Sequence, residues 1–498
     1  MLSIRELSFR CTSAASFWSF LSRLSSLFAT VLIAASLLAA SAQAAVTFNE
    51  ILLTSGDTGT DSTVSGDFNG DGILDLVTVN ASTLSFYEGL GGGQFAAPVS
   101  QALAQNLGAV FAADFNGDGA LDLAIAGAAN SAVVTILLGN GDGTFRQGTN
   151  VTVSGYAAAI TLADFNGDHK PDIAVSDGTN YMTWVFLGNG DGTFKLSQTE
   201  YYGGNTIVSG DFNGDGKQDL VFASSTNVGL FLGKGNGTFS QLILAPLSDV
   251  DSLAVGDFYD NRIQSLAAVV TVPQGAEIND NYIYTLRYAK GQLYVENQNL
   301  FQKGGAVGNW AIAAGDLNGD FKVDLYFSGG FMMTGGLSDY MLGNGDGTFR
   351  PMKTAANPIG TNTSTPFIRD LNLDSRHDVG AAWNSDYDEF GGGAEVLINT
   401  NAIPNCDPPP ANALSVHVCA PQNGETVGST FTFKAAGNAF NGIAKRMELW
   451  IDGTLVSEYL EDQLKATVSL SAGQHTATFV VVDTFDSMAS TSVNFTAE

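Results

Sequence analysis

The sequence predicts an all-β protein, a seven-bladed β-propeller followed by a small immunoglobulin-like β-sandwich. Three observations carry this prediction: an aspartate-rich motif recurs seven times, a glycine-phenylalanine motif recurs in phase with it, and short β-prone runs separate the two. The composition agrees, because 58 glycines and 14% charged residues are typical of many short strands joined by tight turns.

The first 44 residues are predicted to be a secretory signal peptide. Arg5, Arg10 and Arg23 precede an apolar run over 27–40, and small residues at 42–44 offer a cleavage site. The alternative is an uncleaved membrane anchor, but about 14 apolar residues are few for a span that needs roughly 20. We therefore expect a secreted protein, extracellular or at the cell surface, with no membrane span after cleavage.

One motif organises the region 45–400, which is the predicted propeller. The sequence DFNGDGILD at 67–75 returns at 114–122, 164–172 and 211–219, more loosely at 316–324 and 370–378, and in degenerate form at 257–265. The starting positions differ by 47, 50, 47, 46, 59 and 54 residues. A period of this length suits one four-stranded propeller blade, so seven copies predict seven blades.

A second motif lies at a fixed phase within the units. The sequence GNGDGTF at 139–145 returns at 188–194 and 343–349, and with changes at 233–239 and 89–95. Runs such as LDLVTV at 74–79 and VVTILL at 133–138 lie between these glycine turns. Each unit is therefore expected to hold about four short strands.

The two ends of the repeat array predict a closed ring. The seventh unit stops after 396–399 without the glycine turn and its strand, while 46–53 supplies a strand before the first unit. Phe48 in that strand has the phase of Phe95 and Phe145. We expect the N-terminal strand to complete the last blade and so remove an exposed edge. An open solenoid is the alternative, but it would need polar capping units that the sequence lacks.

Residues 401–413 form a proline-rich linker, and 414–498 alternate apolar and polar residues as the strands of a sandwich do. Cys11 lies in the signal, which leaves Cys406 and Cys419, an even number for an exported protein. A disulfide between them would close a loop of 14 residues and stabilise it by about 3 kcal/mol. Two independent small buried residues are the alternative.

The nine-residue motif has the chemistry of a calcium loop. Positions one, five and nine carry Asp, position three carries Asn, and position seven can add its backbone carbonyl, as the six to eight oxygen ligands of Ca²⁺ require. These are not EF-hands, because position twelve is Thr78, Ile125, Val175 or Phe222 instead of Glu and the flanks are strands. Solvated Asx-turns are the alternative. Six copies favour calcium, since three crowded carboxylates repel one another without a cation.

We therefore expect up to six structural Ca²⁺ ions, and no other cofactor. The predicted ligands, loop by loop, are Asp67, Asn69, Asp71, Ile73 and Asp75; Asp114, Asn116, Asp118, Ala120 and Asp122; Asp164, Asn166, Asp168, Lys170 and Asp172; Asp211, Asn213, Asp215, Lys217 and Asp219; Asp316, Asn318, Asp320, Lys322 and Asp324; Asp370, Asn372, Asp374, Arg376 and Asp378.

The sixth position of the loop distinguishes the copies. A sharp turn there favours glycine, and three loops have it: Gly72, Gly119 and Gly216. The other three have His169, Phe321 and Ser375, and we expect their sites to be weaker or altered in geometry. The degenerate copy has Tyr259 and Ser265 at ligand positions three and nine, so no metal is expected there.

The two motifs together resemble the FG-GAP/VCBS repeats of integrin α-subunit N-terminal propellers and their bacterial relatives. The resemblance covers roughly 46–400. It implies a seven-bladed propeller whose calcium ions sit in interstrand loops and keep them rigid, with ligand roles for Asp67, Asn69, Asp71 and Asp75 and for the matching positions of the other five loops. The C-terminal segment resembles bacterial immunoglobulin-like modules that follow exported propellers.

These features predict an extracellular binding or adhesion module whose ligand is a carbohydrate or a protein. A net charge of −29 argues against nucleic acid or anionic lipid as a partner. Longer loops in the fifth to seventh units, at 272–281 and 383–390, are candidate ligand contacts. Trp383, Asp386 and Tyr387 are the named candidates, because a ring can stack on a sugar while carboxylates accept its hydroxyls. Ordinary solvated loops are the alternative.

No catalytic residues are predicted. The four histidines form no H-E-x-x-H motif, and neither a G-x-S-x-G turn nor a phosphate-binding loop is present. A polysaccharide lyase or glycosidase is one alternative, with a carboxylate pair among Glu277, Asp386 and Asp388. A purely structural surface component is the other. The sequence leaves the oligomeric state open.

Overall fold

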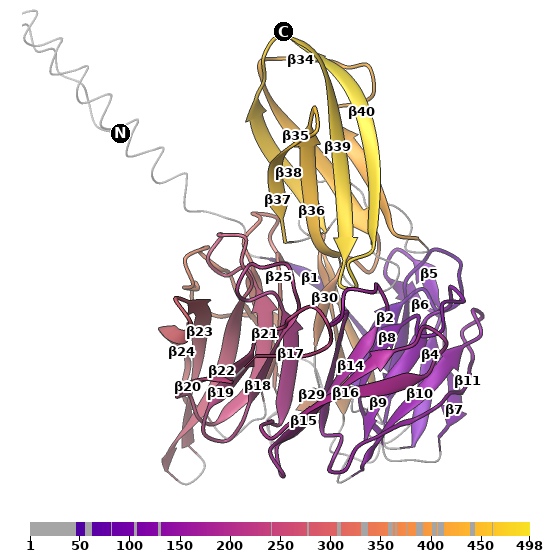
Figure 1. Cartoon of the computed structure of the whole chain (residues 1–498), viewed down its shortest axis with the longest axis vertical. Coiled ribbons are helices and arrows are strands. Elements are labelled where there is room, and N and C mark those ends of the chain that lie inside the picture. The colour runs from indigo at the N-terminus through magenta and orange to yellow at the C-terminus, as the bar shows by residue number, and fades with distance from the viewer. Residues whose placement is uncertain are drawn as a thin grey trace, which may run out of the picture. The chain divides into compact units, whose positions relative to one another are not determined.

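The computed structural model describes residues 46–498 apart from 55–61, 81, 104–106, 128–130, 241, 276–277, 306–309, 330–336, 357–361, 364–365, 375, 385–391, 401–405, 407–412, 439–443 and 461. The predicted signal peptide lies outside the described residues. All regular elements in the described part are strands, shown in Figure 1. No helix within these ranges is long and apolar enough to cross a membrane.

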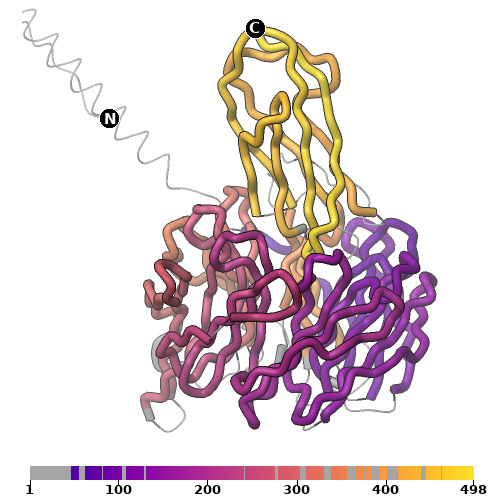
Figure 2. The backbone as a smooth tube through the Cα atoms, viewed as in Figure 1, coloured from indigo at the N-terminus to yellow at the C-terminus, as the bar shows by residue number. Residues whose placement is uncertain are grey.

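Seven antiparallel sheets follow one another along the chain and form the blades of a β-propeller. Because colour follows residue number, each blade in Figure 2 has nearly one hue, so consecutive strands build each blade. Blade one contains β2 (Ser62–Gly66), β3 (Asp75–Val79), β4 (Thr83–Tyr87) and β7 (Val99–Ala102), with the small hairpin β5 (Gly89–Gly91) and β6 (Gln94–Phe95) beside it. Blade two contains β8 (Leu107–Ala113), β9 (Asp122–Gly127), β10 (Val133–Gly139), β11 (Phe145–Gln147) and β12 (Val151–Thr152). Blade three contains β13 (Ala159–Ala163), β14 (Asp172–Asp177), β15 (Met182–Gly188) and β16 (Phe194–Glu200).

The remaining four blades follow the same order. Blade four contains β17 (Thr206–Gly210), β18 (Asp219–Ala223), β19 (Val228–Phe231) and β20 (Ile243–Ala245). Blade five contains β21 (Val250–Gly256), β22 (Ser265–Gly275), β23 (Ile278–Ala289) and β24 (Gln292–Gly305). Blade six contains β25 (Trp310–Gly315), β26 (Asp324–Gly329), β27 (Leu337–Met341) and β28 (Lys353–Ala356). Blade seven contains β29 (Asn362–Thr363), β30 (Phe367–Arg369), β31 (Asp378–Asn384), β32 (Gly392–Asn399) and the N-terminal strand β1 (Phe48–Thr54).

The second strand of each blade is the most deeply buried. Strands β3, β9, β14, β18 and β26 are buried at every residue. Their sequences are continuous apolar runs after a first aspartate, as expected for strands covered on both faces by neighbouring sheets. Each begins at the ninth position of an aspartate loop, so the loop leads directly into the core of the blade.

The ring closes through β1, as the sequence predicts. Strand β1 pairs antiparallel with β32 in a register that runs from Phe48 opposite Asn399 to Thr54 opposite Gly393. On the inner side, the Arg369 Nη1 atom donates to the Ser65 carbonyl at 3.2 Å and ties blade seven to blade one. The solenoid alternative is therefore excluded.

The two sequence motifs meet between neighbouring blades. The amide of Gly143, in the glycine turn of blade two, donates to the carbonyl of Phe68 in the aspartate loop of blade one at 3.1 Å. The rings of Phe68 and Phe145 then pack edge to face with their centroids 5.8 Å apart. The same pair of contacts recurs at three more junctions: Gly192 with Phe115 and Phe194, Gly237 with Phe165 and Phe239, and Gly347 with Phe258 and Phe349. Both motifs recur because each blade must offer one to each neighbour.

The junction of blades six and seven achieves the same contact differently. Blade seven ends in β1 and has no glycine turn of its own. There the side-chain amide of Asn399 donates to the carbonyl of Leu317, the second residue of the blade-six loop, at 2.8 Å. Phe48 packs on the ring of Tyr340 at 6.1 Å. A side chain thus replaces the glycine N–H where the repeat is interrupted.

The C-terminal region is a two-sheet β-sandwich. One sheet contains β33 (Ser415–Ala420), β35 (Thr430–Asn438) and β38 (Gln463–Ser469), and the other contains β34 (Thr426–Val427), β40 (Met488–Ala497), β39 (Gly473–Asp483), β36 (Ala444–Ile451) and β37 (Thr454–Tyr459). Phe433 of the first sheet packs against Phe479 and Phe495 of the second. A disulfide joins Cys406 to Cys419, with the Cα atoms 5.5 Å apart.

One expected loop is a strand pair. Residues 272–281, predicted as an extended loop, belong to the long hairpin of β22 and β23, in which Val272 lies opposite Asp280. β-branched residues at 269–272 continue the strand beyond its usual length and pair across the hairpin. Most of this segment is therefore part of the blade-five sheet.

The inter-blade ring contact gives a stability prediction. Phe145 is 6% exposed, so the change Phe145→Ala should destabilise the protein by about 3 kcal/mol or more, through lost burial and the cavity left behind. The measurement is chemical denaturation followed by circular dichroism. Tyr201→Ala is the control, because that ring is 78% exposed and its loss should change stability little. Equal effects of the two changes would contradict the proposed importance of the contact.

A buried carboxyl group lies between blades six and seven. Both oxygens of Glu395 lie within hydrogen-bond distance of the Ser338 hydroxyl, at 3.1 and 3.0 Å, and the residue is 1% exposed. Burial raises the pKa of Glu395 to about 7, and the charge of Glu50 raises it further while the Ser338 hydroxyl lowers it. The folded protein therefore favours the neutral form of this side chain.

Because the pKa of Glu395 is raised in the folded protein, this group makes stability fall as the pH rises. Below the unfolded pKa of Glu395 the group costs nothing, and stability is lost as the pH rises toward about 7. Glu395→Gln, which is neutral throughout, should be more stable than the parent at pH 8 by about 3 kcal/mol, with no gain near pH 4. Thermal unfolding across this pH range measures the difference. A constant offset between the two proteins at all pH values would refute the assignment.

Candidate functional site

The aspartate loops are ordered by their own carboxylates. In the first loop, Asp67 Oδ1 accepts the amides of Gly70 and Asp71 at 2.7 and 3.1 Å, and its Oδ2 accepts the amide of Gly72 at 2.8 Å. Asn69 Oδ1 accepts the Asp71 amide at 2.9 Å. Asp71 Oδ1 accepts the Ile73 amide at 2.8 Å. The side chains at positions one, three and five therefore turn into the loop.

The ninth aspartate connects the loop to the blade. Asp75 is fully buried, with Oδ2 accepting the Phe68 amide at 2.9 Å and Oδ1 accepting the Gly89 amide at 2.7 Å. Burial raises the pKa of Asp75 to about 7; the two amides lower it, and the carboxylates of Asp67 and Asp71 raise it. Burial likewise raises the pKa of the matching Asp122, Asp172 and Asp219 to about 7.

The non-glycine loops keep the turn, contrary to the expectation of altered geometry. His169 and Phe321 both adopt φ of 62°, and their amides donate to Oδ2 of Asp164 and Asp316 at 2.7 and 2.6 Å. The first-position aspartate thus holds the left-handed residue in place whatever its side chain. Ser375 lies outside the described residues.

One loop does depart from the pattern. In blade six, the Asn318 side-chain amide donates to Asp324 Oδ2 at 3.1 Å, a contact that the first loop lacks. Asn318 is also largely buried, at 8% exposed, whereas Asn69 is half-buried. This loop therefore differs from the first loop at position three. The sequence instead predicts a difference at position six.

The degenerate loop of blade five keeps its shape with neutral groups. The Ser265 hydroxyl accepts the Phe258 amide at 3.2 Å, where the other loops use the ninth aspartate. The Tyr259 hydroxyl donates to Thr285 Oγ1 at 3.0 Å, so the third position lends no oxygen to the loop. This copy retains the turn without the full ligand set.

The donor set of the other loops fits a hard cation. Carboxylate oxygens that accept one N–H keep further lone pairs for a metal, and burial without a paired cation disfavours their ionised state. Among the described residues, the one group with three or more Cys, His, Asp or Glu ligand atoms all within 4.8 Å of one another is Cys406, His417 and Cys419. Both sulfur atoms of this group are in the disulfide. The aspartates of each loop lie farther apart, so a cation would have to draw them inward.

The prediction that Trp383 contacts a ligand is wrong. Trp383 is 4% exposed, and its Nε1 atom donates to the Leu53 carbonyl at 3.2 Å. It packs inside blade seven because the N-terminal strand β1 covers it. Asp386 and Tyr387 lie outside the described residues, as do Glu277 and Asp388, the other acids considered for catalysis.

Exposed tyrosines on blade three were missed by the sequence reasoning. Tyr181, Tyr201 and Tyr202 are 47%, 78% and 49% exposed. Tyr181 precedes β15 and the other two follow β16, whose ends pair at Thr183 and Glu200. The Thr183 hydroxyl also donates to the Tyr202 carbonyl at 2.8 Å. No motif marks these residues, and only strand pairing brings them to one end of the blade.

A buried carboxylate makes this tyrosine-bearing end rigid. Asp177 accepts the amides of Thr179 and Asn180 at Oδ1, and the Tyr156 amide and the Asn180 side chain at Oδ2. Burial raises the pKa of Asp177, but these hydrogen bonds outweigh it and lower the pKa below its usual value. Because β14 runs from Asp172 to Asp177, this turn lies at the opposite end of the blade from the aspartate loop.

The blade architecture and its in-phase loops define a repeat-built β-propeller. Residues 67–125, 114–175 and 211–261 match the family model described as FG-GAP-like repeat. The chain therefore contains FG-GAP-like repeats. No curated protein matches the sequence significantly.

Solved structures show distant likenesses. One is an Agrocybe aegerita lectin that recognises non-reducing terminal N-acetylglucosamine, with 19% identity over 63% of this chain and 81% of that chain and a TM-score of 0.42. Fibronectin(III)-like modules of Clostridium thermocellum CbhA share 20% identity over 17% of this chain and 96% of theirs, with a TM-score of 0.16. An endo-β-1,4-mannanase from Thermotoga petrophila shares 10% identity over 17% of this chain and 20% of that chain, also with a TM-score of 0.16.

Proposed function

We propose that this protein is a secreted, calcium-binding β-propeller that acts as an extracellular binding module for a carbohydrate or protein ligand. The observation that carries the proposal is the three exposed tyrosines at one end of blade three, where Tyr181 lies on the turn ordered by Asp177 and Tyr201 and Tyr202 follow the neighbouring strand β16. Exposed aromatic rings on an ordered turn are the side chains that binding surfaces favour, because they bury large areas at low entropic cost.

Calcium is proposed for the six loops with a full ligand set. Each brings carboxylates from positions one, five and nine, an amide from position three and a carbonyl from position seven into one short turn. Burial is the main cause of the raised pKa of Asp75, and the charges of Asp67 and Asp71 raise it further. A divalent cation would offset both the burial of charge and this repulsion. When bound, the ion would hold the turn that precedes each second strand.

Calcium binding has a direct test. Elemental analysis of the protein should find close to six ions, and Asp71→Ala should lower that count by one. A chelator should lower the melting temperature, because each site stabilises the fold by about 3 kcal/mol at a calcium concentration 100-fold above its Kd.

The control for this test is Asp142→Ala. Asp142 is also an exposed aspartate in a glycine turn, but it belongs to the other motif and accepts only from Thr144. Its loss should leave the ion count unchanged. A protein without bound metal, with the same melting temperature in chelator, would refute the proposal.

A saccharide is a suitable occupant for the tyrosine surface. The apolar C–H face of a sugar ring packs on an aromatic ring, and the amide and hydroxyl groups of Asn180 and Thr179 on the same turn can bond to sugar hydroxyls. The three rings lie on loops between strands, where binding residues are commonly placed on a rigid frame.

A glycan array tests this surface. The parent protein should bind a restricted set of glycans, and Tyr201→Ala should weaken that binding by at least about tenfold. Tyr294→Ala is the matched control, since Tyr294 is 37% exposed on blade five. Unchanged glycan binding by Tyr201→Ala would exclude the tyrosine surface. Turnover of a polysaccharide in a reducing-sugar assay would instead favour an enzyme.

A further inference from the structure

We propose that the C-terminal sandwich is a resident cap on the propeller, docked over one mouth of its central channel by side chains that the aspartate loops carry in place of glycine. The cap is defined here as residues 415–498. Its contacts with the propeller come from blades two, three, five, six and seven.

The sixth position of the loop is the first part of the docking surface. His169 Nδ1 lies 3.3 Å from the Phe485 carbonyl of the cap. The ring of Phe321 packs on that of Tyr459 with the centroids 5.6 Å apart. Lys465 Nζ of the cap lies 5.6 Å from the centre of the Phe321 ring. Arg262, in the degenerate loop, lines a small cavity of about 170 Å³ together with Tyr459.

Of the three glycines at this position, Gly72 is buried and the other two face open space. Gly119 and Gly216 are exposed, and a Cβ atom at either would meet nothing within 4 Å. The three substituted residues have φ of 62°, 64° and 62°, a backbone conformation that disfavours side chains. In these three loops the side chain has a cap residue beside it, which accounts for their departure from the repeat.

Blade seven contributes a charged contact. His377 is 9% exposed; its Nε2 lies 3.0 Å from Asp462 Oδ1 of the cap, and its Nδ1 lies 3.0 Å from the Asp316 carbonyl. The buried guanidinium of Arg369 lines the same cavity as Asp462. The cap thus supplies a negative charge to a buried cation of the propeller.

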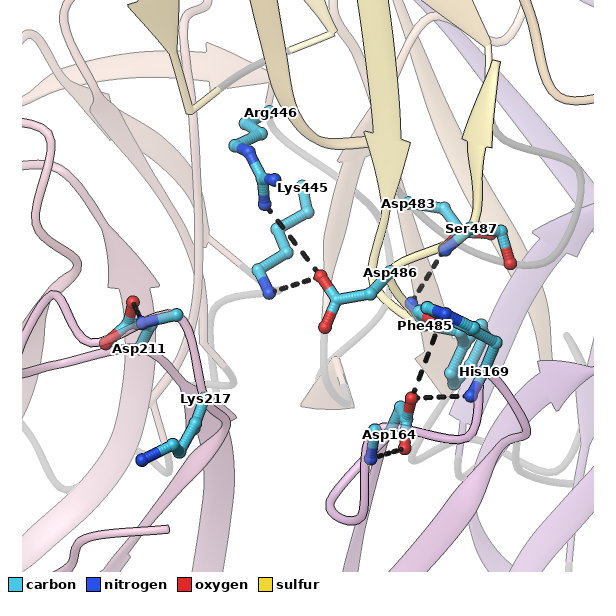
Figure 3. Close-up of polar contacts among 12 residues, drawn as sticks. Asp164, His169, Asp211, Lys217, Lys445, Arg446, Asp483, Phe485, Asp486 and Ser487 are labelled. Carbon is cyan, nitrogen blue, oxygen red and sulfur yellow. Dashed lines mark hydrogen bonds and ion pairs between the residues drawn. The ribbon is translucent and has the colours of Figure 1, made fainter. Parts of the chain in front are cut away.

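A rigid turn of the cap enters the channel mouth (Figure 3). Asp483 Oδ1 accepts the amides of Phe485 and Ser487 at 2.8 and 2.9 Å, and Lys445 Nζ lies 2.8 Å from Asp486 Oδ1. Phe485 at the tip is 3% exposed and joins the buried apolar cluster of blades two and three. The turn is therefore ordered by the cap itself and buried by the propeller.

The cap forms one wall of an internal cavity. A cavity of about 430 Å³ is lined by the first strands of blades one to six, by β30 of blade seven and, on the cap side, by Asp462, Thr484 and Phe485 among others. The aspartate-loop end of the channel is thus covered. The tyrosine surface lies at the other end of the blade, so docking leaves it accessible.

The test restores glycine at the docking positions. The triple change His169→Gly, Arg262→Gly and Phe321→Gly gives these loops the residue of Gly72, Gly119 and Gly216, so the propeller should keep its melting temperature. In small-angle X-ray scattering the full chain should show a larger radius of gyration and maximum dimension than the parent. Thr484 is half-buried, and a thiol introduced by Thr484→Cys should react at least about tenfold faster in the triple-glycine chain, as expected when a covered site opens.

Controls separate docking from folding. His475→Ala removes another His–Asp pair of the cap, in which His475 Nδ1 lies 2.6 Å from Asp452 Oδ2. His475 lies near the start of β39, away from the docked turn, so this change should leave scattering unchanged. Phe485→Ser changes no propeller residue and should open the interface as the glycines do. A Thr484→Cys thiol that in the parent reacts as fast as an exposed Met488→Cys thiol would overturn the proposal. So would unchanged scattering in both docking variants.

Discussion

The contact between neighbouring blades is the interaction on which the rest of the propeller depends. At four junctions, a phenylalanine in the aspartate loop gives its carbonyl to a glycine amide of the next blade and its ring to the phenylalanine that follows that glycine. Glycine is needed at this point because the turn has positive φ, 79° at Gly143, and the backbone must approach closely. The two motifs are therefore halves of one interface. Their common period follows from the requirement that each blade contact both neighbours.

The aspartates that make these loops suitable for a cation also build the loops. Asp67 binds three backbone amides and Asp75 binds two, so most of the turn is organised by charge-assisted hydrogen bonds. In the degenerate loop, the neutral Ser265 hydroxyl accepts the Phe258 amide that an aspartate accepts elsewhere. The backbone turn therefore depends little on charge at the ninth position. Backbone organisation and the proposed metal ligation are thus separable properties of the motif. The chain has kept the first in a place where it has lost part of the second.

The docked sandwich gives the side chains at the sixth loop position a role in contacting the cap. Substituted glycines first indicate a weakened loop, but the first-position carboxylate holds His169 and Phe321 in the same turn as glycine. Their side chains then reach the cap. In the same way the channel mouth, a common place to look for a ligand on a propeller, is occupied by the chain itself. The candidate binding surface therefore lies at the opposite end of the blades, where Tyr181, Tyr201 and Tyr202 are exposed.

The sequence alone determined the all-β class, the seven blades and the closing strand, because these follow from a repeat period and from a strand missing at one end and present at the other. It also identified the oxygen-bearing loops, whose ligand types lie within nine residues. Tertiary structure decided which side chains face solvent and which face another element. Trp383 is buried by β1, which lies more than 300 residues away in sequence. The segment at 272–281 became a hairpin through its cross-strand partners, and the tyrosines of blade three came together only through the register of β15 and β16. Contacts of this kind depend on residues distant in the chain, and a local pattern does not encode them.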